Sequence, residues 1–253
     1  MFDFKMFFMK TLTEKMYEGL KPLYKDLMAH CGAYCDEYRE NTGVPVVSFV
    51  AQWGKLYPQE DNKGILFVGR ATHGWANDDI DVDNLFDHPT DRIFNREDQI
   101  IWAKNYQSPF WSVIKGVANH FYGETGIENI AWTNVSKLAP DSKNGNPSGK
   151  LYSIQQDDDY KIFSKEVEIL NPKVIVFFTG NSKGLYWGWD YICTINDNEE
   201  PKPEQTLPER NWANYKAKVF KIDNRIVILS EHPQTRPIKE HIDCLVEIIS
   251  KNS

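Results

Sequence analysis

Short, continuously apolar segments alternate with amphipathic segments along most of this chain. Four apolar segments have the length and composition of strands buried on both faces of a sheet: residues 64–69, 129–135, 174–178 and 225–230. Apolar positions at helical spacing occur between them in residues 110–122 and 157–170, and after them in residues 237–251. This alternation predicts an α/β fold, a three-layer sandwich with a central four-stranded, mostly parallel sheet.

Three further segments complete the predicted organisation. Residues 13–41 show helical spacing, which predicts an N-terminal helical extension, residues 1–60, packed on an α/β domain of residues 61–253. Residues 217–222 predict an extra strand that pairs with the last apolar segment through a tight turn. The acidic, proline-containing residues 196–210 are interpreted as a surface excursion.

Composition narrows the classes of function. The 253 residues are 41% hydrophobic and 26% charged, which fits a globular protein and excludes a disordered or collagen-like chain. The net charge of −7 excludes a surface that is basic all over, but leaves room for a local basic groove. No apolar run approaches the length of a membrane span. We therefore expect a cytoplasmic, monomeric protein without a membrane partner.

The cysteine pattern allows two interpretations. Cys31 and Cys35 lie four residues apart on the predicted helix, a spacing that could support a pair of metal ligands. Cys193 and Cys244 are scattered and form no second close pair. We therefore expect four free, mostly buried thiols, no metal site and no cofactor.

Polar loops follow each of the four apolar strands. Because parallel strands end at the same edge of a sheet, we expect these loops to converge there. The polar residues in them with the most chemical capacity are His73, Asn134, Asn181, His232 and Arg236. This convergence predicts a polar cleft at the carboxyl edge of the sheet.

Four segments at these loops also occur in a specific order. They are Gly-x-Ala at 69–71, Trp-Thr-Asn-Val-Ser-Lys-Leu-Ala-Pro at 132–140, Asn-Pro-Lys-Val-Ile-Val-Phe-Phe-Thr-Gly at 171–180, and Ser-Glu-His-Pro-Gln at 230–234. Over roughly residues 64–250 their order and spacing resemble the uracil-DNA glycosylase superfamily. The resemblance implies a divergent glycosylase that hydrolyses the N-glycosidic bond of uracil or another damaged base in single- or double-stranded DNA. The alternative is an inactive protein of this fold that binds a nucleotide, nucleic acid or protein partner.

The resemblance implies a base-binding site. Asn134 matches the residue that reads the base, and its amide offers both a donor and an acceptor to a uracil edge. Phe110 or Trp111 stands where an aromatic ring stacks on the extruded base. Gly69 and Ala71 belong to the loop that shapes the site beside the sugar.

Two histidines are the candidate catalytic residues. His232 matches the histidine that faces the pyrimidine O2, where a neutral ring donates a hydrogen bond as the leaving base gains negative charge. His73 is a second candidate, with a loop-capping role as the alternative. A phosphate-facing patch is expected from Ser230, Lys137 and Arg236, with Lys143, Lys150 and Lys239 as further cations.

The sequence departs from the superfamily at three points. Arg70 and Ala71 stand where its branches keep an acidic or amide residue, so no acid occupies that loop position. The nearest carboxylates are Asp78, Asp79 and Asp81, which fit a solvated loop as well as a catalytic acid. The last motif has Gln in place of Ser, and the cysteines do not match the iron–sulfur branch, so no cluster is expected.

Overall fold

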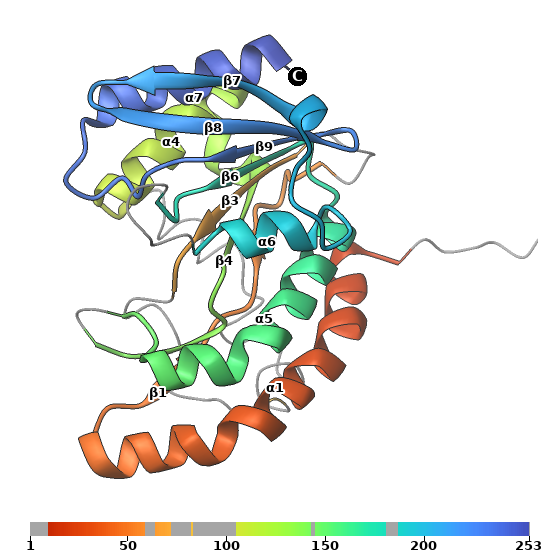
Figure 1. Ribbon diagram of the computed structural model, residues 1–253, viewed down its shortest axis with the longest axis vertical. Coiled ribbons are helices and arrows are strands. Elements are labelled where there is room, and N and C mark those ends of the chain that lie inside the picture. The colour runs from red at the N-terminus through yellow and green to blue at the C-terminus, as the bar shows by residue number, and fades with distance from the viewer. Residues whose placement is uncertain are drawn as a thin grey trace, which may run out of the picture.

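A seven-stranded mixed sheet forms the centre of the molecule (Figure 1). The computed structural model describes residues 10–58, 64–71, 82, 105–142, 145–180 and 187–252. The strand order is β2-β4-β3-β6-β9-β8-β7. The strands of this sheet are β2 (Gln52–Trp53), β3 (Ile65–Gly69), β4 (Ile130–Asn134), β6 (Val174–Phe177), β7 (Thr206–Trp212), β8 (Tyr215–Ile222) and β9 (Arg225–Leu229).

The α/β class is confirmed, but the sheet is larger than predicted. The four predicted strands pair in parallel as β4-β3-β6-β9. Antiparallel strands extend this set at both ends, with β2 beside β4 and with β8 and β7 beside β9. The predicted extra strand is β8, which pairs with β9 through the turn at Asp223 and Asn224. The sheet therefore has seven strands instead of four.

Residues 196–210 lie at the surface, as interpreted, but their carboxyl end is a strand that was not predicted. Residues 206–210 belong to the edge strand β7, which is exposed along most of its length. Its register with β8 shifts between Leu207 and Arg210, and Pro208 lies within this irregularity. An edge strand tolerates proline because one side of its backbone needs no partner strand. Exposure therefore gives this strand the composition of a loop.

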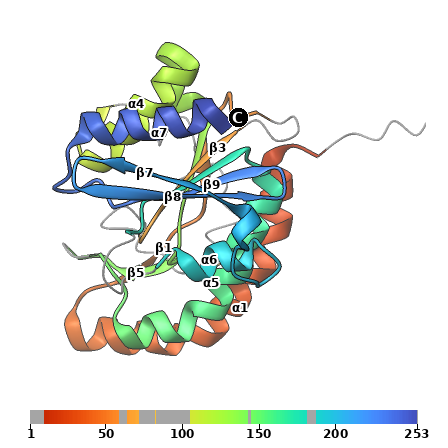
Figure 2. The ribbon, with the colours of Figure 1, turned by 45° about the horizontal axis from the view of Figure 1, so that its top comes forward.

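Amphipathic helices lie on both faces of the sheet (Figure 2). One face carries α4 and α7, and the opposite face carries α1, α5 and α6. The helices are α1 (Leu12–Thr42), α4 (Pro109–Tyr122), α5 (Gly149–Leu170), α6 (Trp189–Thr194) and α7 (Ile238–Asn252), with 3₁₀ helices η1 (Gly123–Asn129) and η2 (Pro203–Gln205). Helix α5 begins before the predicted residue 157 because Ser148 caps it by accepting a hydrogen bond from the Leu151 N–H.

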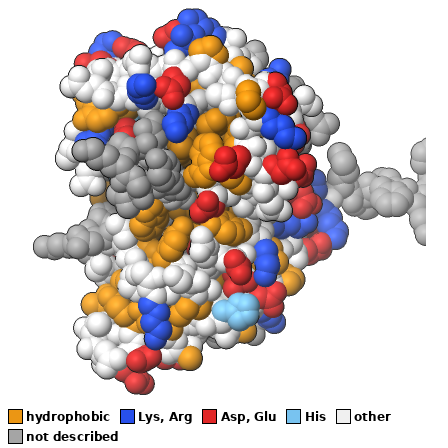
Figure 3. Space-filling model, in the orientation of Figure 1, with side chains coloured by type: hydrophobic (Ala, Val, Ile, Leu, Met, Phe, Trp, Pro, Cys, Tyr) orange, Lys and Arg blue, Asp and Glu red, His pale blue; other side chains and the backbone are white. Residues whose placement is uncertain are grey.

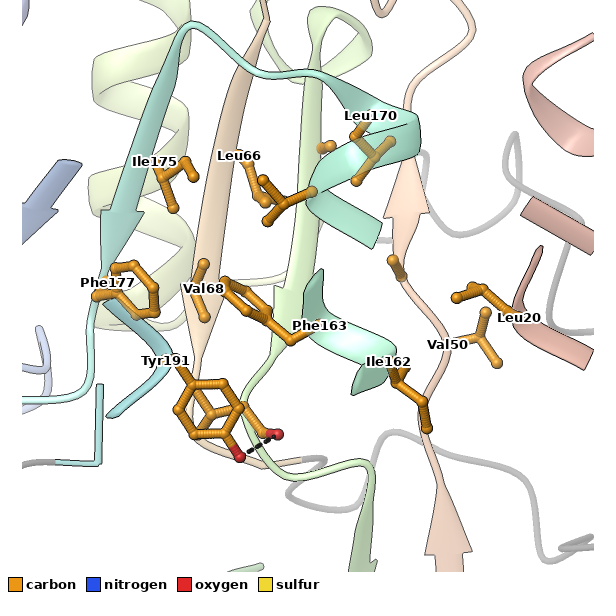
Figure 4. Packing of buried hydrophobic residues seen from close by; sticks show 14 of the residues in the cluster. Leu20, Val50, Leu66, Val68, Ile162, Phe163, Leu170, Ile175, Phe177 and Tyr191 are labelled. Carbon is orange, nitrogen blue, oxygen red and sulfur yellow. Dashed lines mark hydrogen bonds between the residues drawn. The ribbon is translucent and has the colours of Figure 1, made fainter. Parts of the chain in front are cut away.

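Alternation along each parallel strand divides the core in two. In β3, Leu66 and Val68 belong to the cluster under α1 and α5, whereas Phe67 belongs to the cluster under α4 and α7. Figure 4 shows the first cluster, in which Phe163 of α5 and Tyr191 of α6 lie against these strands. Both faces of the parallel strands are therefore buried, which explains their continuous apolar sequences.

The N-terminal segment adds both a helix and strands. Helix α1 begins at a capping box formed by Thr11 and Glu14 and ends at Gly43, whose φ is 69°. Strand β1 (Val46–Ser48) pairs with β5 (Leu138–Pro140), while β2 joins the large sheet. The domain boundary near residue 60 stays a prediction.

The cysteines and the surface of the described residues can be compared with the expectations from the sequence. All four cysteines are free and three are buried, as expected; burial raises the pKa of Cys31 to about 12. No helix within the described ranges is long and apolar enough to cross a membrane. Figure 3 shows basic and acidic side chains interspersed on the face in view, around a central hydrophobic region.

Candidate functional site

The carboxyl ends of the parallel strands meet at one edge of the sheet. Gly69 at the end of β3 lies opposite Asn134 at the end of β4. The pairing continues beyond the strands, because the Val135 N–H donates to the Gly69 carbonyl at 3.0 Å. On the other side, the Gly180 N–H donates to the Ser230 carbonyl at 3.0 Å. These hydrogen bonds hold the first residues of each loop close together.

Asn134 and Gly69 are in very close contact. A Cβ atom on residue 69 would lie 2.4 Å from Asn134 Oδ1 and 3.4 Å from the ring of Phe110. Asn134 is only 2% exposed, and its Nδ2 has no hydrogen-bond partner among the described residues. A buried amide donor without an acceptor costs about 1–3 kcal/mol, so a ligand that supplied the acceptor would gain binding energy.

The ring of Phe110 lies near Gly69 and also contacts His232. Phe110 follows Ser108, whose side chain caps α4, and Pro109 at the first helical position. Its ring stacks on His232 at a centroid distance of 5.9 Å and an interplanar angle of 22°. Trp111 is buried against Trp132 at 4.7 Å, within the core under α4. The structure therefore places Phe110 at the sheet edge and Trp111 in the core.

A local hydrogen bond fixes the tautomer of His232. The Gln234 N–H donates to His232 Nδ1 at 3.2 Å. Because Nδ1 accepts, the neutral ring carries its proton on Nε2. The intervening Pro233 is buried. This loop therefore presents the imidazole as a hydrogen-bond donor through Nε2.

The phosphate-facing role predicted for Ser230 is wrong. Ser230 is fully buried, and its hydroxyl lies 2.8 Å from Nε2 of His241 on α7. His241 in turn stacks on Trp212 at 3.9 Å. Burial, with a smaller contribution from His232, lowers the pKa of His241 to about 3. Sequence reasoning missed His241, which anchors the end of β9 as a neutral ring.

The phosphate-facing role predicted for Lys137 is also wrong. Its side chain is fully buried and its Nζ donates three hydrogen bonds inside the protein. The acceptors are Thr133 Oγ1 at 2.9 Å, the Asn134 carbonyl at 2.7 Å and Glu166 Oε2 at 2.7 Å. Lys137 therefore supports the backbone of Asn134 from within and has no access to a phosphate.

Polar side chains of α5 hold the rest of this loop. Gln155 bonds both the N–H and the carbonyl of Leu138, at 2.8 and 3.0 Å. Asp159 accepts from the Lys137 N–H at 3.1 Å, and burial raises its pKa well above the ordinary value. Gln155 and Asp159 lie at positions i and i+4, and Glu166 follows at i+11. This polar stripe on an otherwise apolar helix face is the sequence signal that could have revealed the support.

Charged residues border the same edge. Arg70 Nε donates to the Thr179 carbonyl at 3.2 Å. Arg236 lies with its guanidinium carbon 4.5 Å from the centroid of the Tyr215 ring and with Nη2 3.8 Å from Glu231. Glu231 is 4% exposed and directly precedes His232, so an acid does lie at this edge, in the loop after β9.

The remaining predicted residues lie elsewhere or outside the described part. Ala71 is half-buried beyond β3. Lys150 lies over the ring of Tyr34, and Lys239 pairs with Asp243. Five predicted positions in loops and one lysine fall outside the described residues: His73, Asp78, Asp79, Asp81, Asn181 and Lys143.

The described side chains contain no group of three or more His, Cys, Asp or Glu arranged to hold a metal ion. The chemistry that the sheet edge offers consists of an amide donor, an aromatic ring, an imidazole donor and two guanidinium groups. A scan against protein-family models finds no match, and a search of curated proteins likewise finds none.

Proposed function

We propose that this protein is a divergent DNA glycosylase that holds an extruded base at the carboxyl edge of its sheet and hydrolyses its N-glycosidic bond. Uracil or another damaged base is the substrate, and the three-layer fold of the superfamily is part of the proposal. The observation that carries it is the buried, unpartnered Nδ2 of Asn134 beside Phe110, whose ring stacks on His232.

Base recognition follows from Asn134 and Phe110. A base must leave the duplex before it reaches such a site, at a cost of a few kcal/mol. Stacking on an aromatic ring returns about 1–3 kcal/mol of that cost. The Nδ2 of Asn134 then donates to a pyrimidine carbonyl, while Oδ1 accepts from the adjacent ring N–H. This pairing favours uracil over cytosine, whose corresponding edge has the opposite donor and acceptor pattern.

Bond cleavage is assigned to His232. As the N-glycosidic bond breaks, the bonding electrons pass to the base, and negative charge accumulates on its O2. The Nε2–H of a neutral His232 stabilises this charge, and the Gln234 N–H keeps the ring in that tautomer. A water molecule then adds its oxygen to the sugar carbon that the base has left, and the proton that it loses passes through solvent to the base anion, which leaves as the neutral base.

Excision assays on uracil-containing oligonucleotides, single- and double-stranded, test the proposal. We expect strand cleavage after alkali treatment with the wild-type protein, and loss of activity in both Asn134→Asp and His232→Ala. The control is His120→Ala, because His120 is exposed on α4 and contacts Phe121. Folded protein that excises no base from a panel of lesions would contradict the proposal.

A second function is favoured by one observation. Arg70 and Ala71 stand in the loop after β3, and neither can activate a water molecule. A protein that binds the nucleotide without cleaving it would need only the base pocket. Tight, Asn134-dependent binding of uracil-containing DNA without release of free base would identify this function.

A further inference from the structure

Two arginines in loops after different strands lie at the sheet edge of the proposed base site. Arg70 directly follows β3, and Arg236 lies in the loop after β9. Strand β6 lies between them in the sheet, and Arg70 reaches across to the Thr179 carbonyl at its end. Arg70 directly follows Gly69, which closely approaches Asn134, and Arg236 lies 3.8 Å from Glu231, which directly precedes His232. Both arginines therefore belong to the same sheet edge as the proposed base site.

Their hydrogen-bonding capacity is largely unused within the described chain. Arg70 has one hydrogen bond there, from Nε to Thr179. Arg236 donates from Nη1 to Thr235 at 3.0 Å, while its buried Nε has no partner. A guanidinium has five N–H donors, so several donors remain for a ligand.

Their charge is only partly compensated. Glu231 lies 3.8 Å from Arg236 Nη2, beyond hydrogen-bond distance. Arg70 forms no ion pair with it among the described contacts. Burial lowers the pKa of Arg70; the nearby Glu231 opposes that shift and Arg236 adds to it. Among these three described residues, two cations and one acid leave one positive charge, which a bound anion would neutralise.

We infer that Arg70 and Arg236 form a phosphate-binding site for the phosphate joined to the sugar whose base lies at Asn134. Planar guanidinium groups match phosphate oxygens in pairs, and a partly desolvated pair strengthens such bonds. The inference rests on the proposed base pocket, but not on cleavage of the glycosidic bond. The phosphate is either a diester of a DNA strand or the monoester of a free nucleotide.

Binding measurements with matched probes test this site. The probes are a short single-stranded oligonucleotide with one deoxyuridine, the same strand with methylphosphonates flanking it, deoxyuridine 5′-monophosphate and deoxyuridine. We expect Arg70→Gln and Arg236→Gln each to weaken binding of the unmodified strand about tenfold. Each should also reduce the slope of log K against log salt by about one. Arg39→Gln, an exposed position on α1, is the control.

The modified probes identify the contact and its source. Methylphosphonates should weaken wild-type binding, and the arginine variants should bind that strand no worse than the wild type does. If the wild type binds the monophosphate more tightly than deoxyuridine and the arginine variants lose this preference, the ligand is a phosphate monoester. If the arginine variants lose affinity only for the unmodified strand, the ligand is a diester. Either result supports the site. Arg70→Lys, which keeps the charge, serves as the second variant if Arg70→Gln does not fold.

Three outcomes overturn the inference. They are unchanged affinity and salt slope in both arginine variants, equal losses on modified and unmodified strands, and failure of the folded wild type to bind any probe. Because the readout is binding, the two proposals fail separately. If the arginine variants lose affinity only for the unmodified strand and no base is excised, the glycosylase proposal alone is contradicted. If a base is excised but the arginine variants lose no affinity, the phosphate site alone is contradicted.

Discussion

Gly69 and Asn134 lie opposite each other across β3 and β4, so close that a methyl group on residue 69 would overlap the Asn134 amide oxygen. The absence of a side chain at residue 69 therefore sets the position of the amide. The contact also joins the end of β3, which Arg70 directly follows, to the residue that we assign to base recognition.

Replacement of Gly69 by alanine should displace the Asn134 amide. The 2.4 Å approach requires either a rotated amide or a shifted strand, at a cost of about 1–3 kcal/mol. We expect lower stability in urea unfolding and a larger loss of uracil-strand binding than that stability change accounts for. Gly149→Ala is the matched control, because its Cβ would meet nothing within 4 Å at the start of α5; it should be neutral or stabilising. Unchanged binding by Gly69→Ala would show that the amide is placed by other contacts.

Lys137→Met should strongly destabilise the fold. It leaves Glu166 as a buried carboxylate without its cationic partner, which costs about 3–5 kcal/mol. The double variant Lys137→Met/Glu166→Gln should recover much of this loss, because residue 166 then carries no unpaired charge. Urea unfolding of the wild type, both single variants and the double variant gives the coupling energy. Strictly additive losses would contradict the pairing.

His241 should make stability depend on pH. Its pKa is about 3 in the folded protein against 6.5 ordinarily, so the unfolded chain binds its proton first as pH falls. Stability from this group is complete above about pH 6.5 and is lost at up to about 1.4 kcal/mol per pH unit toward pH 3. We expect the difference in unfolding free energy between wild type and His241→Gln to shrink as pH falls. The exposed His120→Gln should show no such trend.

Phe110→Leu should weaken DNA binding more than it weakens the fold. The half-buried ring lies at the sheet edge, and its loss removes a stacking surface worth about 1–3 kcal/mol per base. Phe121→Leu, on the same helix and partly buried in the same cluster, should change stability without changing affinity. Fluorescence anisotropy with a uracil-containing strand measures the first effect, and thermal unfolding the second. Equal affinities for the two variants would exclude Phe110 from the site.

The apolar pattern of the sequence was sufficient to predict the strands that are buried on both faces. The strands that contain Phe67 and Val176 are continuously apolar because helices cover both faces. The edge strands β2 and β7 could not be predicted in this way. The former has two residues, and the latter is mostly exposed and contains Pro208. These two segments form strands because they pair with the neighbouring strands β4 and β8.

The candidate site was predictable where strand order alone decides position. Gly69, Asn134 and His232 end or follow parallel strands, and the structure brings them together around Phe110. The burial of Lys137 could not be predicted in this way. Lysine side chains are usually exposed, and the sequence does not show that a buried acid on another element lies next to this one. Its partner Glu166 lies 29 positions away on α5, and only the packing of α5 on β4 reveals the pair.

Helix α1 supports the candidate site indirectly, through α5. His30 of α1 lies 2.7 Å from Asp158 of α5, and Tyr34 lies 2.8 Å from the capping residue Ser148. These contacts hold α5 in place, and α5 in turn binds the loop after β4 through hydrogen bonds of Gln155 and Asp159. Deleting the first sixty residues would therefore remove the support of α5, and the loop that carries Asn134, the residue that we propose for base recognition, would be held less firmly.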